Sequence, residues 1–349
     1  MTDTDQSNYE KALSAFSEND WETAIENVLS SIHEVDLNAV RIWFRFYPLS
    51  LREYILSAED REAVFQGMAL QGDWDLAEQI DTSHRFLYGS RFWPEIKKAV
   101  LKRVDEFVAG AADLEEEIFS VAETAAHQLA VDKSLTLGIS AVGLMTLRQV
   151  GADKFSSTSG EGYKPEGLLK KSPGKIVDAR TSEPSRGVLG FLKTVDKEYK
   201  VIWDENDKRA EFEIIYDEEI ASAAARDQSR DWLEGDKRCI EGVIPVECRS
   251  AACGTCWVGV LGGEENLADV EPLERKQMKV FGYGQKEESK PFMRLACQAS
   301  AEGSVSIVIP PWNGVFGKKV YGNVEKIELE PATTSAAKLR ETISDVLDN

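Results

Sequence analysis

The sequence has no hydrophobic run long enough to cross a membrane. Its most apolar stretch, residues 135–147, is interrupted by glycine, serine and threonine, and it is shorter than the roughly 20 residues that a membrane-spanning helix needs. The first ten residues, MTDTDQSNYE, are acidic and polar, without the basic and apolar regions of a secretory signal and without a twin-arginine pair. We therefore expect a buried helix at 135–147, no membrane insertion, and a cytoplasmic protein whose thiols stay reduced.

The common motifs for nucleotides and covalent hydrolysis are also missing. The sequence contains no GxGxxG, no P-loop and no nucleophile elbow. We therefore expect no flavin or nicotinamide site, no small-molecule substrate and no catalytic activity of the chain's own. The three histidines, His33, His84 and His127, are not spaced as metal ligands, and we expect each to be structural.

Basic residues are scarce relative to acidic ones. The chain has 41 Lys and Arg against 61 Asp and Glu, which gives a formal net charge of −20. Such a charge argues against nucleic acid and anionic membranes as partners, and it permits electrostatic steering toward a basic protein. With 42% hydrophobic and 29% charged residues over 349 positions, the chain is typical of a globular protein with two or more domains.

The N-terminal part has the apolar spacing of helices. Apolar residues recur every three or four positions, first in two short segments separated by a break at Asn19-Asp20. Further helices are predicted over 37–46, 50–71, 73–80, 94–109, 114–129 and 135–150. These segments predict an all-α domain over residues 1–155.

The composition changes after residue 155. A serine- and glycine-rich stretch, followed by one rich in proline, glycine and lysine, predicts a flexible linker over 156–195. In segments 199–203 and 210–216, apolar and polar residues then alternate as they do in strands. The two segments flank a turn and predict a hairpin. The pattern continues with a helix at 219–233, a strand at 257–261, a helix at 272–280 and a strand at 305–309. An acidic tail over 318–349 is predicted to end in a short helix at 335–347.

Four of the five cysteines have the spacing of an iron–sulfur site. Cys248, Cys253 and Cys256 form a C-x₄-C-x₂-C run, and Cys297 follows in the segment RLACQ. This is the ligand spacing of plant-type [2Fe–2S] proteins. A two-iron cluster needs two thiolates on each iron, so a tight loop can supply three sulfurs while a remote segment supplies the fourth. We predict that these four cysteines bind a [2Fe–2S] cluster.

The surrounding sequence resembles the plant-type and bacterial [2Fe–2S] ferredoxin family. The resemblance covers about 199–317, roughly a third of the chain. It includes GVIP at 242–245, CGTC at 253–256, a glycine turn at 262–263 and RLACQ at 294–298, in that order.

The resemblance implies a fold and an arrangement of ligands. It implies a β-grasp domain over 196–317, in which a mixed sheet packs on a helix and the cluster lies in a surface loop. The whole chain is then of the α+β class, with an all-α domain followed by a ferredoxin-like domain. The resemblance also implies that Cys248 and Cys253 bind the more exposed iron, and that Cys256 and Cys297 bind the inner one.

Two features depart from the family pattern. Ala251 occupies a place where the family usually has glycine, so its methyl group is expected to perturb the hydrogen bonds from backbone amides to the sulfurs and to change the potential. The segment 220–242 is longer than usual and strongly charged, which makes it a candidate docking surface.

Several alternatives stay open at this point. Zinc is the main competitor for four cysteines, although structural zinc sites favour paired short-spaced knuckles and only one C-x₂-C is present. We interpret Cys239 as a non-ligand, with a fifth ligand or a redox thiol as the alternatives. Arg249 is either a donor to the cysteine loop or a surface charge. The acidic runs at 217–219 and 264–265 either dock a basic reductase or form a solvated face.

The resemblance implies a one-electron carrier with a potential of about −400 mV. Because no flavin or nicotinamide motif is present, electrons must pass to or from a redox protein, either a reductase or an oxidoreductase complex, docked in part by the helical domain. The alternative is a redox-sensing or scaffold protein whose cluster regulates a helical partner-binding domain.

Overall fold

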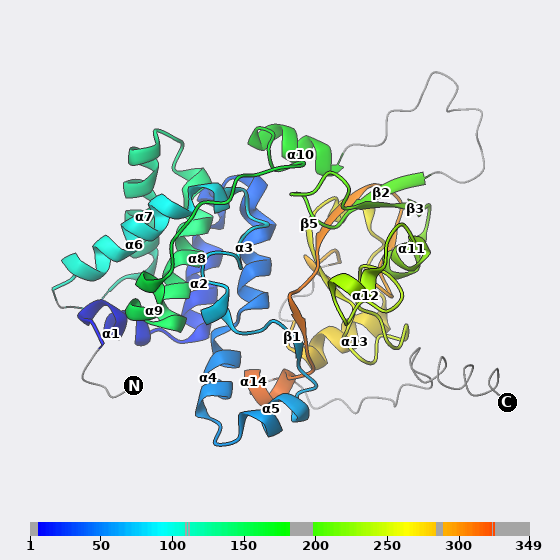
Figure 1. Cartoon of the computed structure of the whole chain (residues 1–349), viewed down its shortest axis with the longest axis horizontal. Helices are drawn as coiled ribbons and strands as arrows, with labels where there is room; N and C mark the ends of the chain where they lie inside the picture. Colours follow the sequence, from blue (N-terminus) through cyan, green and yellow to red (C-terminus); the bar gives the residue numbers. More distant parts are fainter. Residues whose placement is uncertain are drawn as a thin grey trace. The chain divides into compact units, whose positions relative to one another are not determined.

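The computed structural model describes residues 6–108, 110, 112–181, 198–283, 289–322 and 324. The chain divides into two compact units, one made of Met1–Glu53 and Asp75–Val177 and the other of Tyr54–Trp74 and Asp178–Asn349 (Figure 1). The short segment 54–74 therefore belongs to the same unit as the cysteines. The domain limits predicted from the sequence stay a prediction, and the predicted helix at 335–347 lies outside the described residues.

The first unit is helical. Its α-helices are α1 (Asn8–Ser14), α2 (Glu18–Val28), α3 (Glu34–Phe46), α6 (Trp93–Glu106), α7 (Leu114–Leu129), α8 (Ser134–Val150) and α9 (Ala152–Ser157), with 3-10 turns η1 (Leu29–Ser31), η2 (Leu76–Glu78) and η3 (Tyr88–Phe92). Two further helices, α4 (Leu49–Ser57) and α10 (Pro173–Thr181), each cross from one unit to the other.

Helix α8 is the centre of this unit. Nearly all of its residues are buried, as predicted for the stretch 135–147. Gly143 lets it approach α6, because a Cβ there would lie 3.1 Å from Ile96 Cγ2. Among the described residues, no helix is long and apolar enough to cross a membrane.

The predicted break at Asn19-Asp20 is wrong. Both residues lie inside α2, which begins at Glu18. Ser17 Oγ accepts a hydrogen bond from Asp20 N at 3.3 Å, and Ser17 N donates to the Asp20 carboxylate at 2.8 Å. This capping box starts the helix where turn propensity alone suggests a loop.

The predicted helices at 50–71 and 73–80 are also wrong in extent. The first is split into α4 and α5 (Arg61–Gly67), because Asp60 accepts from Ala63 N and begins a new helix. The second is only the 3-10 turn η2, and it is preceded by the short strand β1 (Gln71–Gly72). Gly72 has a φ of +90°, which a helix does not accommodate.

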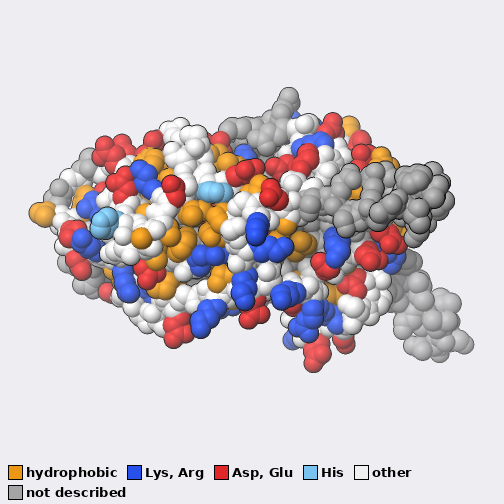
Figure 2. Space-filling model, turned by 90° about the horizontal axis from the view of Figure 1, so that it is seen from above, with side chains coloured by type: hydrophobic (Ala, Val, Ile, Leu, Met, Phe, Trp, Pro, Cys, Tyr) orange, Lys and Arg blue, Asp and Glu red, His pale blue; other side chains and the backbone are white. Residues whose placement is uncertain are grey.

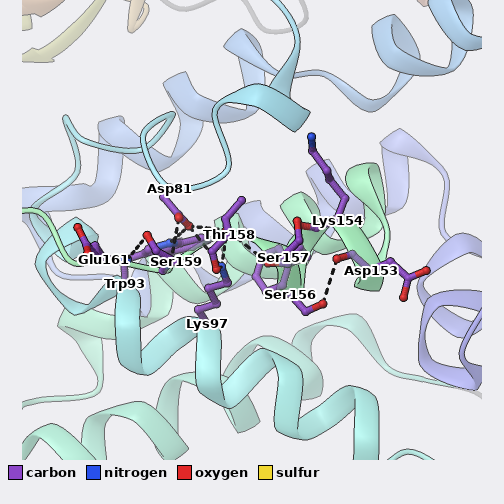
Figure 3. A network of polar contacts seen from close by, with 12 residues as sticks. Asp81, Trp93, Lys97, Asp153, Lys154, Ser156, Ser157, Thr158, Ser159 and Glu161 are labelled. Atoms are coloured by element: carbon purple, nitrogen blue, oxygen red, sulfur yellow. Dashed lines mark hydrogen bonds and ion pairs between the residues drawn. The ribbon is translucent and has the colours of Figure 1, made fainter.

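The serine- and glycine-rich stretch predicted as flexible is anchored to the helical unit by Asp81 (Figure 3). The Asp81 carboxylate accepts hydrogen bonds from Trp93 Nε1 at 2.8 Å and Gly160 N at 2.9 Å. The buried Lys97 donates to Thr158 O at 2.7 Å. Burial alone would raise the Asp81 pKa, but the hydrogen bonds from Trp93, Gly160 and Thr158, together with the Lys97 charge, outweigh it, and the pKa is lowered.

The second unit contains a mixed five-stranded sheet. Its strands are ordered β3 (Glu211–Ile215), β2 (Glu198–Ile202), β8 (Val305–Val308), β5 (Trp257–Gly262) and β6 (Met293–Leu295). Strands β2 and β8 are parallel and the other neighbours are antiparallel. The predicted hairpin is confirmed as the β2–β3 pair, whose residues alternate between exposed and buried.

Shorter elements surround this sheet. They are the strand pairs β4 (Glu218–Glu219) with β7 (Ser300–Ala301) and β1 with β9 (Trp312–Asn313), the helices α11 (Ile220–Arg226), α12 (Trp232–Gly235), α13 (Pro272–Phe281) and α14 (Gly317–Tyr321), and the 3-10 turn η5 (Glu264–Asn266). The predicted helix at 219–233 is wrong in extent, because α11 ends at Arg226 and a loop intervenes before α12.

Candidate metal centre

The cysteine loop, residues 248–256, leads directly into strand β5 and has no regular secondary structure. Its backbone turns sharply, with positive φ at Arg249 (52°), Ala251 (59°) and Gly254 (69°). A positive φ costs an L-residue about 1–2 kcal/mol, so two of these three positions are strained. Ala251, which stands where the ferredoxin family usually has glycine, thus has a backbone conformation that glycine adopts without strain.

Cys248 and Cys253 form one pair of thiols, which we call the outer pair. The Cys248 Sγ accepts hydrogen bonds from Ser250 N at 3.4 Å and Cys253 N at 3.3 Å. The Cys253 Sγ lies 3.1 Å from Thr255 Oγ1. A hydrogen bond between the two thiols lowers the pKa of Cys248 and raises that of Cys253. Cys253 is the one predicted ligand that is only half-buried.

Cys256 and Cys297 form a second pair, which we call the inner pair. They are 1% and 0% exposed. A hydrogen bond between their thiols raises the pKa of Cys256 and lowers that of Cys297. Gln298 Nε2 donates to the Cys297 Sγ at 3.5 Å, and the Ala251 backbone amide also lowers the pKa of Cys297.

Strand pairing brings the inner pair together. Strands β5 and β6 are antiparallel, with Trp257 opposite Leu295, and Ala296 N donates to Cys256 O at 2.9 Å. Cys256 directly precedes the paired Trp257, and Cys297 follows the paired Leu295 by two residues. The sheet register places these two sulfurs next to each other across a long sequence separation.

An ion pair that the sequence does not signal supports strand β6. Arg294 and Glu274 have fully buried side chains and are joined by two hydrogen bonds of 2.9 Å. Glu274 also accepts from Leu295 N at 2.8 Å, and Arg294 donates to Ala268 O at 2.9 Å. Helix α13 thus holds the strand that delivers Cys297, because both carboxylate oxygens of Glu274 accept hydrogen bonds from groups of that strand.

Cys239 and Arg249 have partners away from the four paired thiols. The Cys239 Sγ donates to Val243 O at 3.0 Å, and burial raises the pKa of this thiol to about 12. Arg249 pairs with Glu241 at 2.6 Å and donates to Ser222 Oγ at 3.2 Å. Arg249 therefore ties the cysteine loop to the preceding segment and to helix α11.

The histidines lie in the helical unit. His33 caps α3 by accepting from Val35 N at 3.1 Å, and His127 lies in the last turn of α7. His84 is buried against the Trp93 ring and bonded to Ser90 Oγ at 3.0 Å. Burial lowers the pKa of His84 to about 3.

The donor set fits a two-iron cluster. The four thiols associate two by two, two backbone amides donate to the Cys248 sulfur, and the Gln298 side chain donates to the Cys297 sulfur. Two irons sharing four thiolates need the paired arrangement, and amide donors stabilise the charge that accumulates on the sulfurs.

Comparison with known proteins identifies this part of the chain. Residues 204–302 match the family model described as the 2Fe-2S iron-sulfur cluster binding domain. That range contains all four predicted ligands and resolves the competition between iron–sulfur and zinc left open by the sequence. No family is assigned to the N-terminal region, and neither the curated proteins nor the solved structures give a match to the chain. The C-terminal part of this protein therefore contains a 2Fe-2S iron-sulfur cluster binding domain, and that domain binds a [2Fe–2S] cluster.

Proposed function

We propose that the protein is a one-electron carrier whose cluster is held by Cys248, Cys253, Cys256 and Cys297. The observation that carries this proposal is the division of the four thiols into an outer and an inner pair of different burial. The outer pair binds one iron and the inner pair the other. When bound, the cluster accepts and releases a single electron.

The residues of the chain prepare the site for that electron. The backbone amides of Ser250 and Cys253 donate to the Cys248 sulfur, and the side-chain amide of Gln298 donates to the Cys297 sulfur. These donors favour the extra negative charge on the sulfurs without any movement of the backbone. The buried inner pair is shielded from water, while the half-buried Cys253 would hold its iron nearer the surface, where a partner could exchange the electron.

We propose a β-grasp fold for this domain. The mixed sheet has a β2–β3 hairpin at one edge, and β8 lies in the middle, parallel to β2. Helix α11 follows the hairpin and its apolar side is buried. This is the arrangement that the ferredoxin resemblance implies.

We propose that the redox partner docks at the segment 220–242, beside the outer pair. Arg249 joins the cysteine loop to Glu241 of this segment. Two apolar side chains on it are exposed, Leu233 at 47% and Ile240 at 40%, and exposed apolar groups beside a redox centre suit a transient contact. Figure 2 shows acidic and basic side chains interspersed on the visible face, so the negative charge of the chain does not form a continuous patch there.

We also propose where the carrier acts and with which partner. The partner is a reductase or an oxidoreductase complex, and the helical unit contributes to its docking. The protein acts in the cytoplasm and has no small-molecule substrate. Co-purification from the native host, followed by mass spectrometry, identifies the partner. Recovery of a flavoprotein or another redox enzyme is expected, and recovery of only non-redox proteins favours the sensor alternative.

The central test is cluster content and reversible reduction of the full chain. We expect about two irons and two inorganic sulfides per chain, with a paramagnetic signal after one-electron reduction that disappears on reoxidation. Protein without iron and sulfide contradicts the cluster proposal. A cluster that degrades on oxidation, with release of a protein bound to the helical unit, contradicts the carrier and favours the sensor.

A further inference from the structure

The cluster unit contains two segments that lie outside the family match. The match covers 204–302, yet residues 54–74 and 303–322 belong to the same compact unit. They pair with each other through strands β1 and β9, in which Gln71 lies opposite Asn313. Figure 1 shows the blue helix α5 beside the orange helix α14.

Backbone hydrogen bonds fasten the two segments together. Val315 N donates to Met68 O and Asp73 N donates to Pro311 O, both at 2.8 Å. Lys319 Nζ donates to Gly67 O at the end of α5. Segment 54–74 is therefore bonded along its second half to the chain that follows the family match.

The pairing is backed by a small apolar layer. Met68, Trp312 and Phe316 are buried. The Phe316 ring lies 5.3 Å from the Trp312 ring and 5.8 Å from the Tyr321 ring. Helix α14 is only five residues long, so this layer and the bonds to 54–74 are what hold it in place.

Helix α14 in turn packs on the end of α13 at two glycines. A Cβ on Gly282 would overlap the Tyr321 ring, and a Cβ on Gly317 would overlap Val280 O. Both glycines have positive φ. Contacts this close leave no room for a shift of one helix without a shift of the other.

The last residue of α13 covers the cysteine loop. A Cβ on Gly254 would overlap the Phe281 ring, so that ring lies directly on the backbone between Cys253 and Cys256. Phe281 is 2% exposed, and its ring meets the Trp257 ring edge-on at 5.5 Å. Phe281 thus shields the loop backbone from water.

A second connection leads from β1 to the segment before the cysteine loop. A Cβ on Gly72 would lie 2.5 Å from Pro311 O and 3.1 Å from Arg238 Cζ. Arg238 donates to Pro310 O at 3.1 Å and pairs with Asp236 at 2.7 Å. The β1–β9 pair is therefore packed against the approach to the loop as well.

Building on the proposed function, we propose that segment 54–74 is a positioning segment for the cluster: through α14 and α13 it presses Phe281 onto the cysteine loop and so sets the reduction potential. The physical reason is solvation. Reduction adds a negative charge to a cluster that is already anionic, and water stabilises the more highly charged state. A ring that keeps water from the loop therefore holds the potential low, and loosening it raises the potential.

The test compares two glycines of the full chain in the same unit. Gly72→Ala forces apart β1 and β9, because Gly72 has a φ of +90° and no room for a methyl group. Gly235→Ala is the matched control, because no atom lies within 4 Å of a Cβ at that position. Phe281→Leu removes the ring directly. We expect Gly72→Ala and Phe281→Leu to raise the midpoint potential, to change the g-values of the reduced cluster, and to lose iron to a chelator several-fold faster than the control.

The outcomes separate positioning from simple support. If Gly72→Ala lowers thermal stability but leaves the potential and the g-values at those of Gly235→Ala, the segment only stabilises the fold and the inference is overturned. If Gly72→Ala does not fold, Lys319→Met is used, since it removes the exposed bond to Gly67 O and is expected to shift the same readouts more weakly. An unchanged potential and g-values in Lys319→Met would then overturn the inference.

Failure of the proposed function is visible separately. Wild-type protein without a cluster contradicts the carrier and the effect on the potential, but not the positioning of the cysteine loop by segment 54–74. In that case, hydrogen exchange of amides 249–256 in the metal-free chain replaces the potential as the readout. Faster exchange in Gly72→Ala than in Gly235→Ala supports the positioning segment, and equal exchange overturns it.

Discussion

The outer and inner cysteine pairs are built from different kinds of structure. Cys248 and Cys253 lie in one short loop, and local backbone turns bring their sulfurs together. Cys256 and Cys297 are far apart in the chain, and the register of β5 and β6 joins them. One pair depends on strained loop conformations, the other on buried tertiary contacts.

The difference indicates how each pair responds to change. Strain in the loop is carried by Arg249 and Ala251, and changes there are expected to alter the unfolding free energy by about 1 kcal/mol. The inner pair rests on the buried Glu274–Arg294 ion pair, whose disruption is expected to cost several times more. We therefore expect the inner pair to be the more sensitive half of the site.

The largest expected effect is from Cys297→Ser. This change removes the sulfur that links the loop to the sheet, so we expect the iron and sulfide content to fall from about two of each per chain to almost none. Chemical iron and sulfide analysis measures the loss, with Cys239→Ser as the control that keeps the wild-type spectrum. A Cys297→Ser protein with a full cluster shows that Cys297 is not a ligand.

Glu274→Gln tests the tertiary support of the inner pair. The change leaves the buried Arg294 charge unpaired, and we expect the free energy of unfolding to fall by about 3–5 kcal/mol. Denaturant unfolding of the metal-free chain measures it. The exposed Glu265 provides a control, since Glu265→Gln is expected to stay within about 0.5 kcal/mol of wild type. Equal effects of the two changes would contradict a supporting role for the ion pair.

Ala251→Gly tests the strain in the outer loop. Ala251 has a φ of +59°, so glycine is expected to raise the free energy of unfolding by about 0.5–1 kcal/mol. The neighbouring Ala252 lacks a positive φ and is the control, because the change in the free energy of unfolding is expected to have the opposite sign there. Ala252→Gly is expected to destabilise by about 0.5–1 kcal/mol. The same sign for both variants in denaturant unfolding would rule out strain as the cause.

The smallest expected effect concerns Cys239. Burial raises the pKa of this thiol to about 12, so at pH 8 it stays protonated and should resist alkylation in the folded chain. Mass spectrometry after iodoacetamide treatment measures this, and alkylation after unfolding is the control. Rapid modification of the folded protein would instead indicate a redox thiol.

Much of the fold could be predicted because its signals are local. The β2–β3 hairpin follows from alternation, and α8 of the helical unit follows from its apolar spacing. The predicted helix boundaries are wrong where a side chain caps the backbone. Ser17 caps α2 where composition alone predicts a break at Asn19-Asp20. Asp60 caps α5 where composition alone predicts one continuous helix over 50–71.

The sequence by itself determined the chemistry of the site. The C-x₄-C-x₂-C spacing predicts the kind of cluster and, together with the remote Cys297, the four candidate ligands, because three of the sulfurs are set by spacing within one short loop. Only the tertiary structure decided that Glu274 holds β6, that Phe281 covers Gly254, and that segment 54–74 belongs to the cluster unit. These contacts join residues distant in the chain, and their energies depend on burial, which no local pattern in one sequence encodes.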